Sequence, residues 1–383
     1  MRGLQNLDKI HVVGVRTDPA GNKLSIKPPE FISSKRVMVR YSEQGGTDMD
    51  GVIEIRRGLK DLNLGKSNYA QVRIAVDGTH YLKGMAVYAD DLPAGKDIRF
   101  NTNKSKSVPM IGEGDTVLKR MKSDPDNPFG ATIRRQMEYL DSKGNKKLSP
   151  VNIVNEEGSW GDWSKTLSAQ FLSKQNLSFA KQQLDITTAE KKDKFETIMS
   201  LTNPVLRKRA LQEFADSCDS DATRLRAAAV PNQAYQVILP VKTLKPTEVY
   251  APNFKNGSQV ALVRYPHGGT FEIPIVTVNN GHKQARRTIG EMAADAIGIH
   301  PKVAQRMSGA DFDGDTVMVI PVTPKSRIRS TSPLKGLEGF DPSAAYPSYP
   351  GMKVMSEITK QREMGKISNL ITDMTIKGPR KLN

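Results

Sequence analysis

The sequence contains the motif Gly309-Ala310-Asp311-Phe312-Asp313-Gly314-Asp315, followed at once by the apolar run Thr316-Val317-Met318-Val319-Ile320. The apolar run predicts a buried strand, and the three aspartates occupy alternate positions just before it. In a flat strand such side chains would share one face about 6.6 Å apart, too far apart to chelate one ion. Gly314 gives the backbone the freedom to curl and bring the carboxylates together.

Three converging carboxylates repel one another unless a cation neutralises them, and oxygen-only ligation favours Mg²⁺ or Mn²⁺. Asp311, Asp313 and Asp315 are therefore the candidate metal ligands. An EF-hand is excluded because Thr316 replaces its glycine at the sixth position and Val322 replaces its glutamate at the twelfth. A solvated acidic turn without metal is the alternative.

Composition places this motif in a basic chain without a disulfide framework. The 383 residues include 57 Lys+Arg, 41 Asp+Glu and one cysteine, with a formal charge of +16. We expect two or three domains, a soluble protein of a reducing compartment such as the cytoplasm, and no membrane partner, because no run approaches about 20 apolar residues. The charge favours a nucleic-acid partner, with a merely solubilising surface as the alternative.

Patterning around the motif predicts an α+β fold in five segments. Short alternating runs predict β domains over 1–115 and 231–325, and a Lys-, Gln- and Ala-rich composition predicts a helical spacer over 116–230. A linker rich in Pro, Ser and Gly covers 326–351, and a helix covers 352–383. The expected strands include His11–Val15, Arg36–Arg40, Val52–Ile55, Val72–Val76, Asp97–Phe100, Gln236–Leu239, Val260–Arg264, Phe271–Val276 and Val317–Ile320.

Two signals predict where helices of the spacer begin. Thr187-Thr188-Ala189-Glu190 has the spacing of a capping box and predicts a helix starting there. Asn203-Pro204 offers a cap and a first-turn proline for the next helix.

The aspartate motif resembles a signature of a known family. Ala310–Asp315 is similar to the Ala-Asp-Phe-Asp-Gly-Asp sequence of the largest subunit of multisubunit RNA polymerases, whose aspartates hold the catalytic magnesium on a double-psi β-barrel. Gly309 stands where that family usually has Asn. Arg264-Tyr265-Pro266 resembles the family's Arg-x-Pro element, which implies that Arg264 reaches the ribose hydroxyls of the incoming nucleotide. A solvated arginine at a strand end is the alternative.

Two further elements resemble the same class of enzymes. Tyr81–Ala86 and Asn101–Lys106 are similar to the partner barrel, whose two lysines reach the primer end and the triphosphate. The resemblance implies these roles for Lys83 and Lys104, with Lys106 as the alternative for the second. Arg362–Asp373 is similar to the Leu-Gly-x-Ile-x-Asn bridge helix of single-chain RNA-silencing polymerases and their phage relatives. An ordinary amphipathic helix is the alternative.

Together these elements imply a single-chain RNA polymerase core of the phage or RNA-silencing type, with two double-psi β-barrels. The resemblance implies template-directed RNA synthesis from NTPs with two Mg²⁺ ions, which Mn²⁺ can replace. A DNA template is favoured because the resemblance is closest to phage enzymes, which also implies the cytoplasm of a bacterial host. An RNA template is the alternative.

The length of the chain leaves other possibilities open. It stops just after the bridge-like helix, so we expect a missing C-terminal part or further polymerase subunits. A non-catalytic nucleic-acid-binding remnant and a metal-dependent nuclease are the rival functions.

Overall fold

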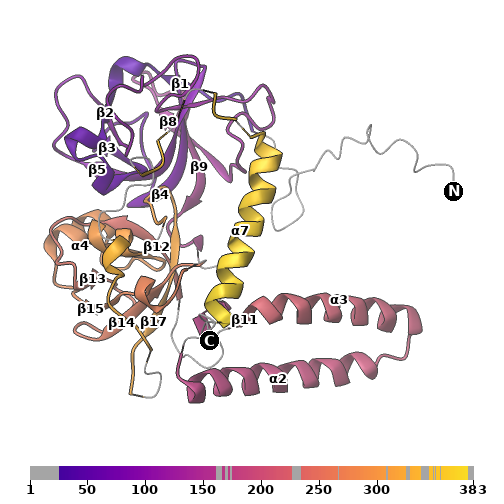
Figure 1. The fold of residues 1–383 in the computed structure, drawn as a ribbon. Helices are drawn as coiled ribbons and strands as arrows, with labels where there is room; N and C mark the ends of the chain where they lie inside the picture. Colours follow the sequence, from indigo (N-terminus) through magenta and orange to yellow (C-terminus); the bar gives the residue numbers. More distant parts are fainter. Residues whose placement is uncertain are drawn as a thin grey trace. The chain divides into compact units, whose positions relative to one another are not determined.

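The computed structural model describes residues 26–160, 166–168, 171–172, 175–226, 234–265, 267–307, 309–324, 328–337, 345–347, 349, 351–353 and 355–377. The chain divides into two compact units, residues 1–156 and 157–383 (Figure 1). Both β and α elements are present, as an α+β fold requires. The predicted strand at His11–Val15 lies outside the described residues.

The first unit is built on a nine-stranded sheet. Its hydrogen-bonded path runs β2-β6-β3-β5-β4-β9-β8, while β1 pairs with β4 and β7 pairs with β5. The strands are β1 (Phe31–Ile32), β2 (Val37–Arg40), β3 (Val52–Arg56), β4 (Tyr69–Val76), β5 (His80–Ala89), β6 (Ile98–Asn101), β7 (Lys119–Arg120), β8 (Arg135–Leu140) and β9 (Lys146–Glu156). Their apolar side chains form one core cluster, which includes Ile53, Val72, Leu82 and Val151.

The first unit differs from its prediction in length and secondary structure. The helical spacer was expected from residue 116, but β7, β8 and β9 lie in this region and the unit continues to Glu156. Averaging the composition over 116–230 hid the apolar residues of β9, of which Val151 and Ile153 are buried in the core. Tertiary pairing with β4 therefore decides this segment.

The second unit contains a closed barrel of six strands in the order β12-β16-β13-β15-β14-β17. These strands are β12 (Ala234–Pro240), β13 (Glu248–Tyr250), β14 (Gln259–Val263), β15 (Ile275–Val278), β16 (Ala296–Ile299) and β17 (Thr316–Pro321). The β-branched residues predicted β12, β14 and β17, whereas β13 and β16 were not predicted. Residues 270–272 form a 3₁₀ turn before β15 instead of the first part of a strand.

Five strands follow the same pattern in both units. The order β2-β6-β3-β5-β4 matches β12-β16-β13-β15-β14, with parallel and antiparallel pairs alternating identically along each series. In the second unit β17 joins β14 to β12 and closes the barrel. Among the described strands of the first unit, β4 instead pairs with β9, which continues to β8, so the expected first barrel is an open sheet here.

The helical part of the spacer is a hairpin of two long helices, α2 (Leu177–Met199) and α3 (Pro204–Thr223), which run side by side in Figure 1. A two-stranded sheet of β10 (Thr166–Ser168) and β11 (Arg224–Arg226) flanks them in sequence. As predicted, Asn203 caps α3: its side chain accepts hydrogen bonds from the Val205 and Leu206 amides.

The start of α2 differs from the prediction. The helix is capped by Asn176 and passes through Thr187, which is buried and donates its hydroxyl to the Gln183 carbonyl. The capping-box spacing at Thr187 therefore has no structural role as a helix start. Burial of the face of α2 that contains Thr187 overrides the capping-box signal.

Described residues that follow the barrel in the sequence pack against it. Residues of the predicted linker 326–351 pack on the barrel, because Ile328 is buried and Ser330 donates to the Ile273 carbonyl. The C-terminal helix α7 (Glu357–Lys377) forms as predicted, and residues 378–383 lie outside the described part. None of the helices in the described ranges combines the length and the apolar character that a membrane crossing needs.

Candidate metal centre

The aspartate loop connects α5 (Pro301–Arg306) to the barrel strand β17. Its start is fixed by a hydrogen bond from the Ala310 amide to the Met307 carbonyl, and its end by one from the Ile238 amide of β12 to the Asp315 carbonyl. Because β17 pairs with both β12 and β14, the end of the loop is attached to a closed set of strands. The barrel therefore positions the last aspartate of the loop.

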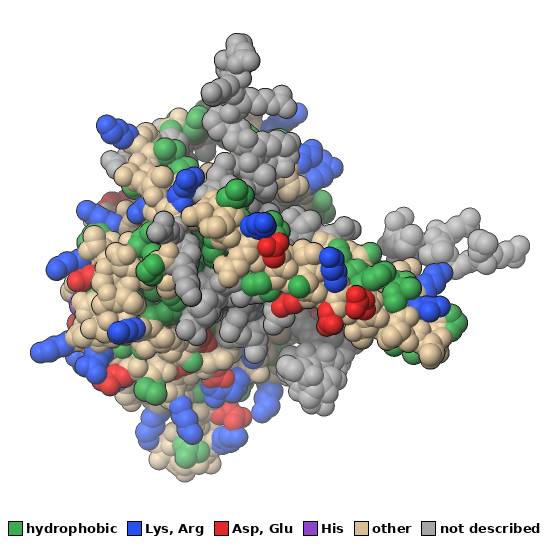
Figure 2. Space-filling view, turned by 90° about the horizontal axis from the view of Figure 1, so that it is seen from below, with side chains coloured by type: hydrophobic (Ala, Val, Ile, Leu, Met, Phe, Trp, Pro, Cys, Tyr) green, Lys and Arg blue, Asp and Glu red, His purple; other side chains and the backbone are tan. Residues whose placement is uncertain are grey.

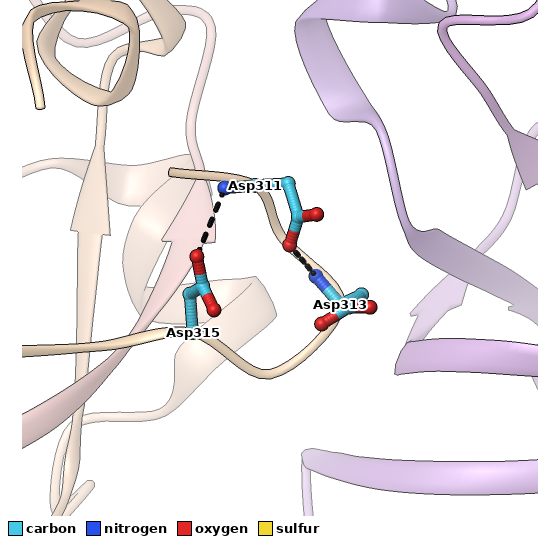
Figure 3. A group of neighbouring side chains, drawn as sticks. All are labelled: Asp311, Asp313 and Asp315. Atoms are coloured by element: carbon cyan, nitrogen blue, oxygen red, sulfur yellow. Dashed lines mark hydrogen bonds between the residues drawn. The ribbon is translucent and has the colours of Figure 1, made fainter. Parts of the chain in front are cut away.

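The three aspartates converge, as the sequence predicted. Oxygen atoms of Asp311, Asp313 and Asp315 all lie within 4.8 Å of one another, and each residue is half-buried. Backbone amides help to curl the loop: the Asp313 amide donates to Asp311 Oδ1 at 3.1 Å, and the Asp311 amide donates to Asp315 Oδ2 at 3.2 Å (Figure 3). The loop therefore gathers three acidic side chains at one point.

Arg264 is part of the same cluster. It follows β14, and its Nε and Nη2 atoms lie 3.0 Å and 2.9 Å from Asp315 Oδ2. Three carboxylates and one guanidinium leave a formal charge of −2, which one divalent cation would neutralise. Pro266, the last residue of the Arg-x-Pro element, lies outside the described residues.

Glycines allow the backbone of this loop. Gly309 has a φ of +68°, and a β-carbon built there would lie 3.6 Å from Arg264 Nη1. Glycine and asparagine both tolerate this left-handed conformation. Gly309 therefore meets the backbone requirement at the position where the polymerase signature usually has Asn.

Two buried titratable residues near Arg264 were missed by the sequence analysis. Glu272 accepts a hydrogen bond from the Gly268 amide, and burial raises its pKa although the charge of Arg264 opposes this. His267 is 3% exposed, and burial lowers the pKa of its imidazole to about 4. No sequence pattern identifies either residue. The burial of both depends on the 3₁₀ turn after Gly269 and on the strands around that turn.

The predicted lysines belong to the first unit. Lys83 is half-buried on β5, opposite Arg73 of β4. Lys104 donates from Nζ to Asp115 Oδ1 at 2.5 Å and to the Thr116 carbonyl at 2.8 Å. Lys106 has an exposed side chain, and its backbone amide donates to Glu43. Glu43 also accepts from the Ser105 hydroxyl, which contributes most to lowering its pKa to about 2.

The donor set fits a hard divalent cation. Carboxylate oxygens are the ligands that Mg²⁺ and Mn²⁺ prefer, and no histidine or cysteine belongs to this cluster among the described residues. The cluster also lies in a loop in which Gly309 and Gly314 both have positive φ values. Asp311, Asp313 and Asp315 are therefore the residues that could ligate a metal ion.

No protein-family model and no curated protein matches this sequence. The chain is similar to a solved structure described as RNA dependent RNA polymerase QDE-1 from Thielavia terrestris, with 14% sequence identity and a TM-score of 0.44. The match covers 92% of this chain and 42% of that one, so the chain spans less than half of that polymerase. The expected relation to phage enzymes and to the largest subunit of multisubunit polymerases finds no support there, and no residue role is transferred from this likeness.

Proposed function

We propose that this chain is a metal-dependent nucleotidyltransferase that synthesises RNA from ribonucleoside triphosphates on a nucleic-acid template. The observation that carries the proposal is the convergence of Asp311, Asp313 and Asp315 beside Arg264, in a loop anchored to a closed barrel. The similarity of Ala310–Asp315 to the signature of RNA polymerases gives this geometry its chemical direction.

The three aspartates would bind Mg²⁺, and Mn²⁺ would substitute. When bound, the metal would acidify the 3′-hydroxyl of the RNA and, with a second ion brought by the nucleotide, neutralise charge on the triphosphate. The contribution of the chain itself is positioning: amide hydrogen bonds curl the loop, and the β12 contact fixes Asp315.

Arg264 has two roles in this proposal. Its guanidinium keeps the Asp315 carboxylate oriented through two nitrogen contacts. The same guanidinium is proposed to reach the ribose hydroxyls of the incoming nucleotide, which would favour ribonucleotides over deoxyribonucleotides.

The lysines of the first unit are proposed to contact phosphate groups. Lys83 would neutralise charge at the primer end, and Lys104 would contact the triphosphate after exchanging Asp115 for phosphate. Lys106 remains the alternative for the second role, because its side chain is exposed.

The primer-extension experiment described below decides whether the template is DNA or RNA. The sequence-based preference for DNA finds no support in the comparison with solved structures, and an RNA template agrees better with the description of the polymerase found there. Watson–Crick pairing would read the template sequence in either case.

Primer extension tests the proposal. The purified chain is supplied with Mg²⁺, four ribonucleotides and a labelled RNA primer on matched DNA and RNA templates. Wild-type protein should extend the primer, Asp313→Asn should not, and Asp185→Asn on the exposed face of α2 should behave as wild type. Extension by the Asp313→Asn variant at the wild-type rate would refute the assignment of the site.

The rival functions give different products in the same assay. A nuclease would shorten the labelled strand without nucleotides. A binding remnant would retain the strand intact and unextended, also after addition of candidate partner subunits.

A further inference from the structure

The outer end of the α2–α3 hairpin exposes apolar side chains next to basic ones. We define the hairpin tip as residues 194–209, the end of α2, the connecting turn and the start of α3. Val205 is 75% exposed and Leu206 is 57% exposed. The other exposed apolar side chains of the tip are Phe195, Met199 and Leu201.

The hairpin tip is also the basic part of the hairpin. It contains Lys194, Arg207, Lys208 and Arg209 against the single acid Glu196. The rest of α3, residues 210–223, contains four acids and no Lys or Arg. In Figure 2, blue and green side chains gather at the outer end of the arm that projects to the right, with red ones nearer its middle.

This charge distribution is not explained by the stability of α3. Helices are stabilised by acids near the N-terminus and bases near the C-terminus, whereas α3 has the reverse order. Of the three bases in its first turns, Arg209 alone has an acid partner among the described side chains of the helix, Glu213. A reversed pattern that disfavours the isolated helix is expected where the bases serve an external anion.

We propose that the hairpin tip binds nucleic acid, with Arg207 and Lys208 contacting backbone phosphates and Val205 and Leu206 packing against bases. Basic side chains flanking a small aliphatic wedge are the combination that inserts at base steps or strand junctions. The proposed phosphate contacts use side chains and not the first backbone amides of α3. The amides of Val205 and Leu206 already donate hydrogen bonds to the side chain of Asn203. The proposal does not depend on RNA synthesis by the aspartate loop.

Two other occupants fit the hairpin tip less well. The centres of protein interfaces are depleted of charged residues, whereas here three consecutive bases, 207–209, directly follow the exposed pair Val205 and Leu206. A membrane-binding helix has a long apolar face, whereas the large exposed apolar side chains in the described part of α3, Val205 and Leu206, lie in its first turn.

Binding measured without nucleotides and in EDTA tests the hairpin tip separately from catalysis. Fluorescence anisotropy would follow a labelled single strand, a duplex and a fork over a range of salt concentrations. The variants are R207Q/K208Q and V205Q/L206Q. The matched control, K181Q/K255Q, removes the same charge from exposed lysines at the start of α2 and on the barrel.

R207Q/K208Q should lower the slope of log K against log salt by about 1.8 on a duplex or about 1.4 on a single strand. V205Q/L206Q should weaken binding about fivefold with the slope unchanged, as expected for burial of roughly 40 Å² of apolar surface. The control K181Q/K255Q should change neither the salt slope nor the affinity to this extent. Circular dichroism should show the same helicity for all variants as for the wild-type protein. The substrate with the largest loss identifies the strand geometry.

Equal binding by the two tip variants and the control, on all three substrates, would overturn the proposal. So would a loss of self-association or of vesicle binding in V205Q/L206Q with nucleic-acid binding unchanged. Failure of primer extension has no bearing on this result, because neither nucleotide nor metal is present.

Discussion

Acidification should destabilise the second unit through His267. Burial lowers the pKa of this imidazole from 6.5 to about 4, so the folded state resists the proton that the unfolded state accepts. As pH falls below 6.5 the unfolded state binds more protons, and stability is lost until pH reaches the folded pKa. The shift corresponds to about 3 kcal/mol over the whole window, of which about 2 kcal/mol is lost by pH 5.

Urea unfolding followed by tryptophan fluorescence measures the loss of stability of the second unit. Both tryptophans, Trp160 and Trp163, belong to the second unit, and Trp160 is fully buried. Wild-type protein should lose about 2 kcal/mol between pH 7.5 and pH 5 beyond the loss of His267→Gln, which has no imidazole to protonate. Glu272 is common to both proteins, so its raised pKa cancels in the difference.

The matched control is Met292→Gln, which replaces a non-titrating side chain of the second unit that is 89% exposed. This variant should keep the wild-type dependence on pH, because it removes no titrating group. If His267→Gln loses as much stability as the wild-type protein between the two pH values, the reasoning from burial is refuted.

Three further predictions concern the loop, the nucleotide and the first unit. Asp313→Asn should leave the free energy of unfolding unchanged or higher without metal, since it relieves like-charge repulsion, and Mg²⁺ should raise the melting temperature of wild type but not of this variant. Arg264→Ala should narrow the preference for ribonucleotides over deoxyribonucleotides in single-nucleotide incorporation; an unchanged preference would remove its proposed ribose contact. Gly84→Ala should disrupt the pairing of β3 with β5, because its β-carbon would lie 1.9 Å from the Gly51 carbonyl oxygen. Hydrogen exchange should show that disruption in the first unit, and native protection of β3 and β5 would contradict it.

Local patterns predicted the elements whose partners lie nearby or whose composition is extreme. The β-branched run Val317–Ile320 predicted β17, and Asn203-Pro204 predicted the start of α3, because a cap and a first-turn proline act within one turn of helix. The alternating aspartates and Gly314 predicted that the carboxylates converge. Each of these signals lies within a few residues of the feature it specifies.

Long-range pairing decided the elements that the patterns missed. Residues 146–156 form a strand that pairs with its neighbour β8 and with β4, which lies far away in the chain, although the average composition of the region favours helix. Thr187 became a buried helical residue for a similar reason: the unit covers that face of α2.

The chemistry of the aspartate loop follows from local sequence, because three acids and a flexible glycine fall within five consecutive residues. The pairing of Arg264 with Asp315 depends on the fold, since 51 residues separate them and the antiparallel pairing of β14 with β17 brings them together. Burial of His267 and Glu272 also arises only on folding, because desolvation depends on every element around a side chain and not on its neighbours in sequence.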